Sequence, residues 1–175
     1  MKRIGFGQVE PNHLSAQRNG QIYAQRKYEG SRESLENGMF LKYTISGNKE
    51  VASVSGEGEW MLVLNEVKLY DDAWRYMQAV EGKAGAYSGY AMMPDNSGAM
   101  TPRLFKTAIG DIFTTNTIGD GKSDVTVEVG DKLTVGTDGY LKVTEEPTAG
   151  EMTWLVVRVY TMPDGQEGVK IQRIA

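Results

Sequence analysis

Few side chains in this sequence could do chemistry, and His13 is the most reactive of them. The chain has 175 residues, with one histidine and no cysteine. Acid–base or triad chemistry based on histidine would therefore need His13, and a cysteine nucleophile or a cysteine zinc site is excluded. His13 lies in a polar stretch without apolar periodicity, whereas a catalytic group must be held tightly in position. We expect His13 to bond to a partner or to water, and we predict that the chain is not an enzyme.

The carboxylates follow turn signals. Five aspartates lie beside glycine or serine, where aspartate bonds to the backbone of a turn; they are Asp120, Asp124, Asp131, Asp138 and Asp164. The stretch from Asp120 to Asp124 lacks the ligand spacing and the bidentate acid of an EF-hand loop. A glycosidase needs two carboxylates across a cleft, and the sequence neither favours nor excludes such a pair. We predict no metal ion and no cofactor.

Two glycine-containing stretches do not have the context of a nucleotide site. Gly5-Phe6-Gly7 has no apolar strand before it and no helix after it. Gly121-Lys122-Ser123 lies in a turn and lacks the upstream glycine of a phosphate-binding loop. Aromatic residues do not alternate with a basic stripe either, so we predict no nucleic-acid partner.

Charge is unevenly distributed along the chain. The net charge is −4, but residues 1–32 hold six basic and two acidic side chains, whereas the remainder holds 13 basic and 21 acidic ones. A basic segment before an acidic body suits docking on an acidic partner, and the alternative is a solvated segment without specific contacts. No apolar run follows the basic start, and Trp60–Leu64 is too short to span a bilayer, so we expect neither a signal peptide nor a membrane span.

Residues 1–36 are predicted to form an extended N-terminal arm. Their apolar side chains are scattered without helical or strand period, so the arm cannot bury a core of its own. Its many amides suit pairing with exposed backbone groups of a partner, which would order the arm. The candidate partner-binding residues are Arg3, Phe6, Asn12, His13, Gln17, Arg18, Gln21 and Tyr23.

Residues 37–175 are predicted to form a compact β domain, because glycine-containing turns separate short apolar runs. The expected strands are Met39–Thr44, Glu50–Ser55, Trp60–Tyr70, Arg103–Thr107, Asp111–Thr115, Val125–Val129, Lys132–Val135, Tyr140–Thr144, Thr153–Thr161 and Val169–Ile174. Turn signals about every 8–12 residues are typical of a small barrel or sandwich. The predicted fold class is therefore all-β, with at most one short helix.

Two strand patterns and one helix pattern predict further details of the fold. The first half of Trp60–Tyr70 is continuously apolar and is expected to be buried on both faces. In Thr153–Thr161, simple alternation places Trp154, Val156, Arg158 and Tyr160 on one face. Asp71–Val80 could form the short helix, with an aspartate cap.

Residues 82–102 form a long excursion of small, aromatic and methionine residues. Tyr and Met are enriched at interfaces, so this stretch is a possible surface-binding loop; its candidate residues are Tyr87, Tyr90, Met92 and Met93. The alternative is that such side chains fill the core beneath a loop.

Several stretches of the chain together resemble small structural proteins of tailed bacteriophages. They are VEPNHLSAQRNGQIYAQ (Val9–Gln25), LENGMFLKY (Leu35–Tyr43), GEWMLVLNEVKLY (Gly58–Tyr70), FKTAIGDIFTTN (Phe105–Asn116), VGDKLTVGTDGYL (Val129–Leu141) and VVRVYTMPDGQEGVKIQRI (Val156–Ile174). The resemblance is to head decoration, or capsid-stabilising, proteins encoded near the major capsid protein. It covers most of the chain and rests on general texture rather than on one sharp motif.

The resemblance implies a structural role on the exterior of a virion, for a protein made in the cytoplasm of a bacterial host. The partner would be the major capsid protein, which the arm would contact, and the chain would form a homo-oligomer such as a trimer. Shell geometry would supply many copies, so each contact could be weak. The alternative function is a carbohydrate- or host-surface-binding module displayed on a phage particle.

Overall fold

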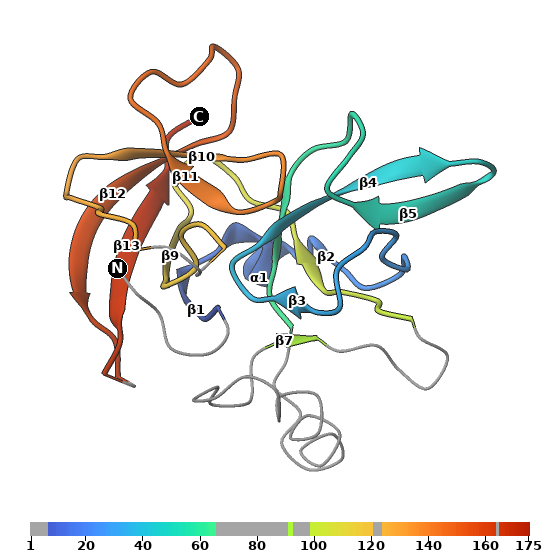
Figure 1. Cartoon of the computed structure of the whole chain (residues 1–175), viewed down its shortest axis with the longest axis horizontal. Coiled ribbons are helices and arrows are strands. Elements are labelled where there is room, and N and C mark those ends of the chain that lie inside the picture. Colours follow the sequence, from blue (N-terminus) through green and yellow to red (C-terminus); the bar gives the residue numbers. More distant parts are fainter. Residues whose placement is uncertain (1–6, 66–90, 93–98, 121–123, 164) are drawn as a thin grey trace.

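Antiparallel strands are the main secondary structure of the protein, whose computed structural model describes residues 7–65, 91–92, 99–120, 124–163 and 165–175 (Figure 1). Its helical content in these residues is one five-residue helix, α1 (Ser15–Asn19). The strands form two larger sheets and one small pair. The predicted all-β class, with at most one short helix, is confirmed, and the arrangement is that of a sandwich.

The first sheet has six strands, and every neighbouring pair is antiparallel. In spatial order they are β1 (Val9–His13), β9 (Ile112–Thr115), β13 (Glu167–Arg173), β12 (Thr153–Thr161), β10 (Lys132–Val135) and β11 (Leu141–Val143). The predicted bounds of β10 and β12 agree with the structure.

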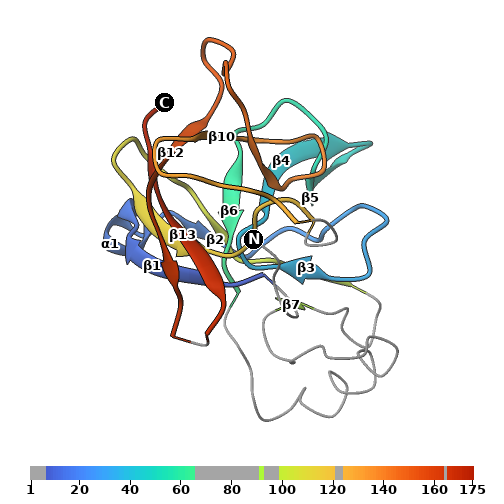
Figure 2. The same ribbon diagram turned by 60° about the vertical axis from the view of Figure 1, so that its left-hand side comes forward.

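The second sheet has five strands. In spatial order they are β2 (Ile22–Tyr23), β8 (Leu104–Phe105), β6 (Met61–Val63), β4 (Phe40–Ser46) and β5 (Lys49–Ser53). A separate antiparallel pair joins β3 (Leu35–Glu36) to β7 (Ala91–Met92). In the turned view of Figure 2, β12 and β13 lie on one side of the molecule and β4 and β5 on the other.

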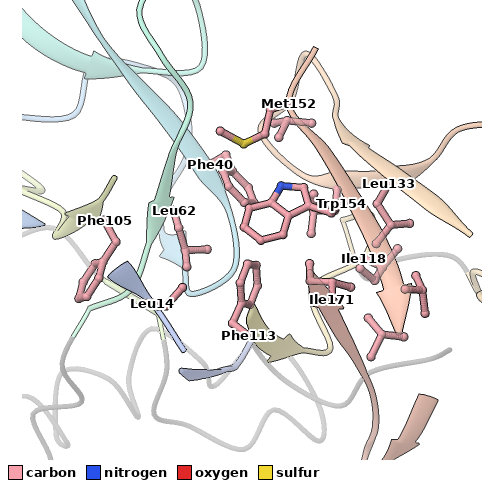
Figure 3. Close-up of a cluster of buried hydrophobic side chains, with 14 of the residues drawn as sticks. Leu14, Phe40, Leu62, Phe105, Phe113, Ile118, Leu133, Met152, Trp154 and Ile171 are labelled. Atoms are coloured by element: carbon pink, nitrogen blue, oxygen red, sulfur yellow. The ribbon is translucent and has the colours of Figure 1, made fainter. Parts of the chain in front are cut away.

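An aromatic cluster joins the two large sheets (Figure 3). Trp154 of β12 is fully buried, and its ring meets that of Phe113 edge-on at a centroid distance of 4.9 Å. Phe40 of β4, in the other sheet, lies 5.9 Å from Trp154. Aromatic burial of this size is a large part of the energy of a small core, so these rings hold the sandwich together.

The five-stranded sheet is buried on both faces. Leu62 packs into the cluster between the sheets, whereas Met61 and Val63 pack into a second cluster on the opposite face. Tyr140 and Leu35 belong to this second cluster. The prediction that the strand beginning near Trp60 is buried on both faces is therefore confirmed for Met61–Val63.

The N-terminal segment is part of the sandwich, which corrects the division predicted at residue 36. In residues 7–36, β1 pairs with β9 and β2 pairs with β8. Leu14 and Ala16 are buried in the cluster between the sheets, and Leu35 lies in the second cluster. The apolar residues show no period because each short piece of this segment contributes to a different sheet.

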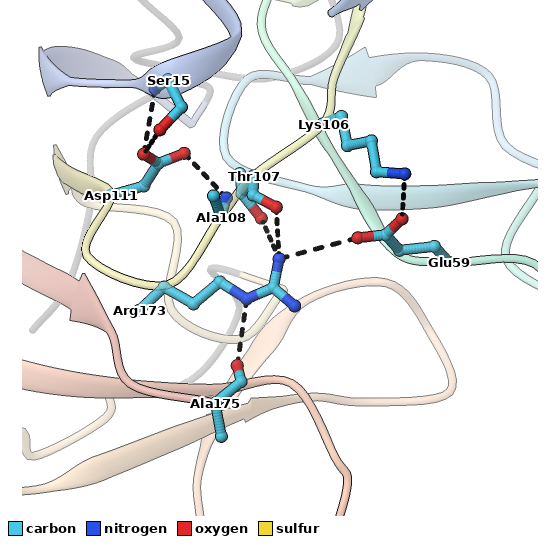
Figure 4. A network of polar contacts seen from close by, with 8 residues as sticks. All are labelled: Ser15, Glu59, Lys106, Thr107, Ala108, Asp111, Arg173 and Ala175. Carbon is cyan, nitrogen blue, oxygen red and sulfur yellow. Dashed lines mark hydrogen bonds and ion pairs between the residues drawn. The ribbon is translucent and has the colours of Figure 1, made fainter.

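Two polar networks also join distant segments (Figure 4). Asp111 is 1% exposed, and its carboxylate accepts hydrogen bonds from the hydroxyl and backbone N–H of Ser15, so it caps α1 from another part of the chain. Arg173 at the end of β13 donates to the Thr107 carbonyl at 2.5 Å and lies 3.7 Å from Glu59. The first network ties α1 to the turn before β9, and the second ties β13 to residues that flank β8 and β6 of the other sheet.

One type of turn introduces three strands of the six-stranded sheet. The turns are Ala108–Asp111 before β9, Glu128–Asp131 before β10 and Thr148–Glu151 before β12. In each, the backbone N–H of the acidic residue donates to the first carbonyl, at 3.0, 3.2 and 3.0 Å. Its carboxylate accepts from the first N–H, at 3.0, 2.8 and 3.1 Å. The third residue of each turn is a glycine with positive φ, as this geometry requires.

One predicted strand needs correction, and two other predictions concern residues that the structure does not describe or describes only in part. Residues 125–129 are not a strand, because no neighbouring strand pairs with them; the Glu128–Asp131 turn leads from them into β10. The predicted helix Asp71–Val80 lies outside the described residues. So does most of the excursion predicted over residues 82–102, of which the structure describes 91–92 and 99–102.

Candidate interaction surface

A β-bulge in β12 decides which side chains reach the surface of the six-stranded sheet. Trp154 and Val156 point into the core, and the register shifts between Val156 and Arg158. Beyond the shift, Val159 is opposite the buried Val169, although it is itself 36% exposed near the end of the sheet, and Arg158 and Tyr160 lie on the other face. The prediction that Arg158 and Tyr160 share the face of Trp154 is therefore wrong, because one extra residue reverses the alternation.

We use the term outer sheet face for the side of this sheet turned away from the core. The cross-strand register places the following residues there: Glu10, Asn12, His13, Ile112, Thr114, Lys132, Thr134, Lys142, Leu155, Arg158, Tyr160, Lys170 and Gln172. Lys170 lies between the fully buried Val169 and Ile171, and alternation along a strand therefore directs it outward.

Tyr160 anchors one end of this face. Since β13 lies between β12 and β9, the Tyr160 side chain crosses a strand to reach its partners. Its hydroxyl donates to the Glu10 carboxylate at 2.8 Å, and its oxygen lies 2.9 Å from Oγ1 of Thr114. Gly168, opposite Tyr160, has no side chain in the way. Burial raises the pKa of the Tyr160 phenol; the hydrogen bond to Thr114 lowers this pKa and the bond to Glu10 raises it.

Three of the predicted partner-binding residues meet at one edge of this face. Asn12, His13 and Arg18 are all exposed. Asn12 Oδ1 accepts a hydrogen bond from the Thr114 hydroxyl at 2.7 Å, and Arg18 lies 3.3 Å from Nε2 of His13. The edge strand β1 and the helix that follows it bring these side chains together.

The other predicted residues lie elsewhere. Gln17 and Gln21 are exposed, but Gln21 accepts a backbone bond from Lys106 in the other sheet. Tyr23 packs edge-on against Tyr43 at 6.0 Å, so it contributes to the second core cluster instead of a surface. Met92 lies in β7, whereas Arg3, Phe6, Tyr87, Tyr90 and Met93 lie outside the described residues.

Sequence reasoning missed the basic residues of this surface. Lys132, Arg158 and Lys170 come from three adjacent strands, of which β12 and β13 form one hairpin and β10 lies well before them in the sequence. Lys132 and Arg158 are exposed and Lys170 is partly exposed. Simple alternation would have identified Lys132 and Lys170 as outward residues of their strands, but only the bulge places Arg158 beside them.

A second surface feature lies beside β5 of the other sheet. An open hollow of ≈ 360 Å³ is lined by Gln25, Arg26, Lys27, Lys49, Glu50 and Val51. Arg26 and Glu50 form an ion pair across it at 2.5 Å. This ion pair neutralises one of the three cations that line the hollow.

In the part of the chain that the structure describes, no helix has the length and apolar character needed to cross a bilayer. No cluster of three or more potential ligands from histidine, aspartate or glutamate is placed there to hold a metal ion.

Comparisons with known proteins give no identification. The chain matches no protein-family model, no curated protein and no solved structure.

Proposed function

We propose that the chain is a capsid decoration protein of a tailed bacteriophage, which binds the outer surface of the major capsid protein shell and stabilises it. The observation that carries the proposal is the outer sheet face, at whose edge the exposed Asn12, His13 and Arg18 lie together. The resemblance of the sequence to decoration proteins supports the same role. The place of action would be the exterior of the virion.

The architecture suits a protein that binds through a broad surface. The outer sheet face belongs to a sheet whose inner face is fixed by the buried Trp154, Phe113 and Ile171. A rigid surface loses little conformational entropy when it binds, which favours affinity. On a shell, many copies in a fixed lattice add to the effect of each contact.

The N-terminal segment contributes to binding from within the fold. Leu14 and Ala16 are buried, so deleting residues 2–30 would remove part of the core together with any contact residues. Substitution of exposed side chains is therefore the suitable way to test the segment.

The test is binding to icosahedral shells that lack the protein. We expect the wild-type chain to co-purify with such shells in stoichiometric amounts and to raise the temperature at which they break open. The double variant His13→Ala/Arg18→Ala should bind about tenfold more weakly, because its contacts at the sheet edge are lost. Lys27→Ala/Lys49→Ala, which removes two exposed cations beside the hollow, serves as the matched control and should bind like the wild type.

Two results would count against the proposal. One is a wild-type chain that does not associate with shells at any concentration. The other is specific retention on a glycan array together with no association with shells, which would favour the host-surface-binding alternative.

A further inference from the structure

Two cations of the outer sheet face lie directly opposite each other, an arrangement that does not stabilise the fold. Arg158 of β12 lies directly opposite Lys170 of β13. Like charges directly opposite each other on neighbouring antiparallel strands destabilise a sheet. On the neighbouring strand β10, Lys132 is opposite Leu155 of β12. Leu155 is the residue that precedes Arg158 on the same face of β12, so Lys132 lies diagonally across from Arg158. The three side chains form a basic row across adjacent strands.

Some basic residues of the described part form ion pairs, whereas the three cations of the basic row do not. Arg26, Lys106, Lys142 and Arg173 each lie within 4.0 Å of an acidic side chain. For the basic row, the described part of the structure contains no ion pair that involves Arg158, Lys170 or Lys132. The chain as a whole has a net charge of −4, so this face concentrates unneutralised positive charge on an acidic protein.

The guanidinium group of Arg158 is held near a fixed aromatic ring. Its central carbon lies 5.6 Å from the centroid of Tyr160. Tyr160 is itself held by its hydrogen bond to Glu10. An arginine placed in this way loses less freedom on binding, and its planar donors suit a carboxylate in particular.

The same residues favour an acidic protein over a nucleic acid. Tyr160 is the one aromatic side chain that the register places on this face among the described residues, and its hydroxyl is already bonded to Glu10. Single-stranded nucleic acids need free aromatic rings on which bases stack.

We infer that the outer sheet face docks an acidic protein surface, with Arg158, Lys170 and Lys132 supplying the cations that meet its carboxylates. The inference rests on the proposed function in one respect: the acidic partner would be the outer surface of the protein shell. Complementary charge would then set the orientation of the protein on the shell and speed its association.

The first arm of the experiment compares two charge-reversed proteins with equal net charge. Arg158→Glu/Lys170→Glu changes the basic row, and Lys27→Glu/Lys49→Glu makes the same change beside the hollow. We expect the first to bind shells about 100-fold more weakly and the second to stay within about threefold of the wild type. The wild-type affinity should fall steeply with salt, and this dependence should be weaker in the first variant. Thermal unfolding checks that both variants are folded.

The second arm uses a probe that does not depend on a shell. Poly-L-glutamate is titrated into the isotopically labelled chain, and backbone amide shifts are followed by NMR. We expect shifts clustered on β12, β13 and β10 in the wild type, and their loss in Arg158→Glu/Lys170→Glu. A single-stranded oligonucleotide of similar charge should bind more weakly than poly-L-glutamate.

The outcomes separate the inference from the proposed function. Shell binding that is equal in the wild type and Arg158→Glu/Lys170→Glu would overturn the inference and leave the proposed function standing. Poly-L-glutamate binding at this face without shell binding would support the surface and contradict the function. Preference for the oligonucleotide, or shifts that trace to self-association of the chain, would overturn the inference.

Discussion

Replacing Trp154 with alanine is expected to lower the free energy of unfolding by about 3–5 kcal/mol, because it removes the largest buried side chain of the core. The indole contacts Phe113 of its own sheet and Phe40 of the other, so the cavity would open at the contact between the two sheets. Urea unfolding, followed by circular dichroism, measures the change.

Trp60 provides a control with the same substitution. Its side chain is only partly buried, and Nζ of Lys42 lies 4.3 Å from its ring centroid. Trp60→Ala should cost less than half as much as Trp154→Ala, because solvent already covers part of the ring. Equal losses in the two variants would show that Trp154 is not the central contact between the sheets.

Asp111→Ala is expected to cost about 3 kcal/mol, since it removes a buried carboxylate that accepts three part-buried hydrogen bonds. The Asp111 carboxylate accepts from the backbone N–H groups of Ser15 and Ala108 and from the Ser15 hydroxyl. The substitution therefore removes the cap of α1 and loosens the attachment of the N-terminal segment. Urea unfolding gives the loss in stability, and hydrogen exchange of residues 14–19 shows where the structure opens.

Asp131→Ala is the matched control for this substitution. Asp131 closes the same type of turn, and its carboxylate accepts from Glu128 N–H at 2.8 Å. This bond is exposed, so water can replace it, and the cost should stay below about 1 kcal/mol. A similar loss for both aspartates would mean that Asp111 acts only within its own turn and does not hold the N-terminal segment.

The sequence predicted strands best where both signals of a strand, alternation and flanking turns, were present. The bounds of β10 and β12 agree with the structure, as does the turn at Asp138-Gly139 that joins β10 to β11. Residues 125–129 have apolar alternation and a turn after them, but they form no strand, and their turn leads into β10. Local pattern alone does not distinguish the Asp-Gly turn within a hairpin from the Gly-Asp turn that only leads into a strand.

The N-terminal segment shows a second limit of local reasoning. Its strands β1, β2 and β3 are short, and each finds its partner far away in the sequence. Leu14 is buried because elements from both sheets surround it, and no period within residues 1–36 could reveal this. The polar composition of this segment therefore indicates an extended arm, although tertiary contacts make the segment part of the fold.

Only part of the candidate surface can be predicted from the sequence. Asn12, His13 and Arg18 were identified by composition, and the structure brings them to one edge of the outer sheet face. The basic row depends on strand order and on the bulge in β12, and neither can be derived from one strand in isolation.

The most direct test of docking through the outer sheet face is lysine acetylation. The protein is acetylated both free in solution and bound to capsid shells, and mass spectrometry identifies the modified lysines. Lys132 and Lys170 are expected to become several-fold less reactive on the shell, while Lys27 and Lys49 react as they do in the free protein. Protection of Lys27 and Lys49, with Lys132 and Lys170 unchanged, would contradict docking through this face, because the protein would then bind through the opposite side of the sandwich.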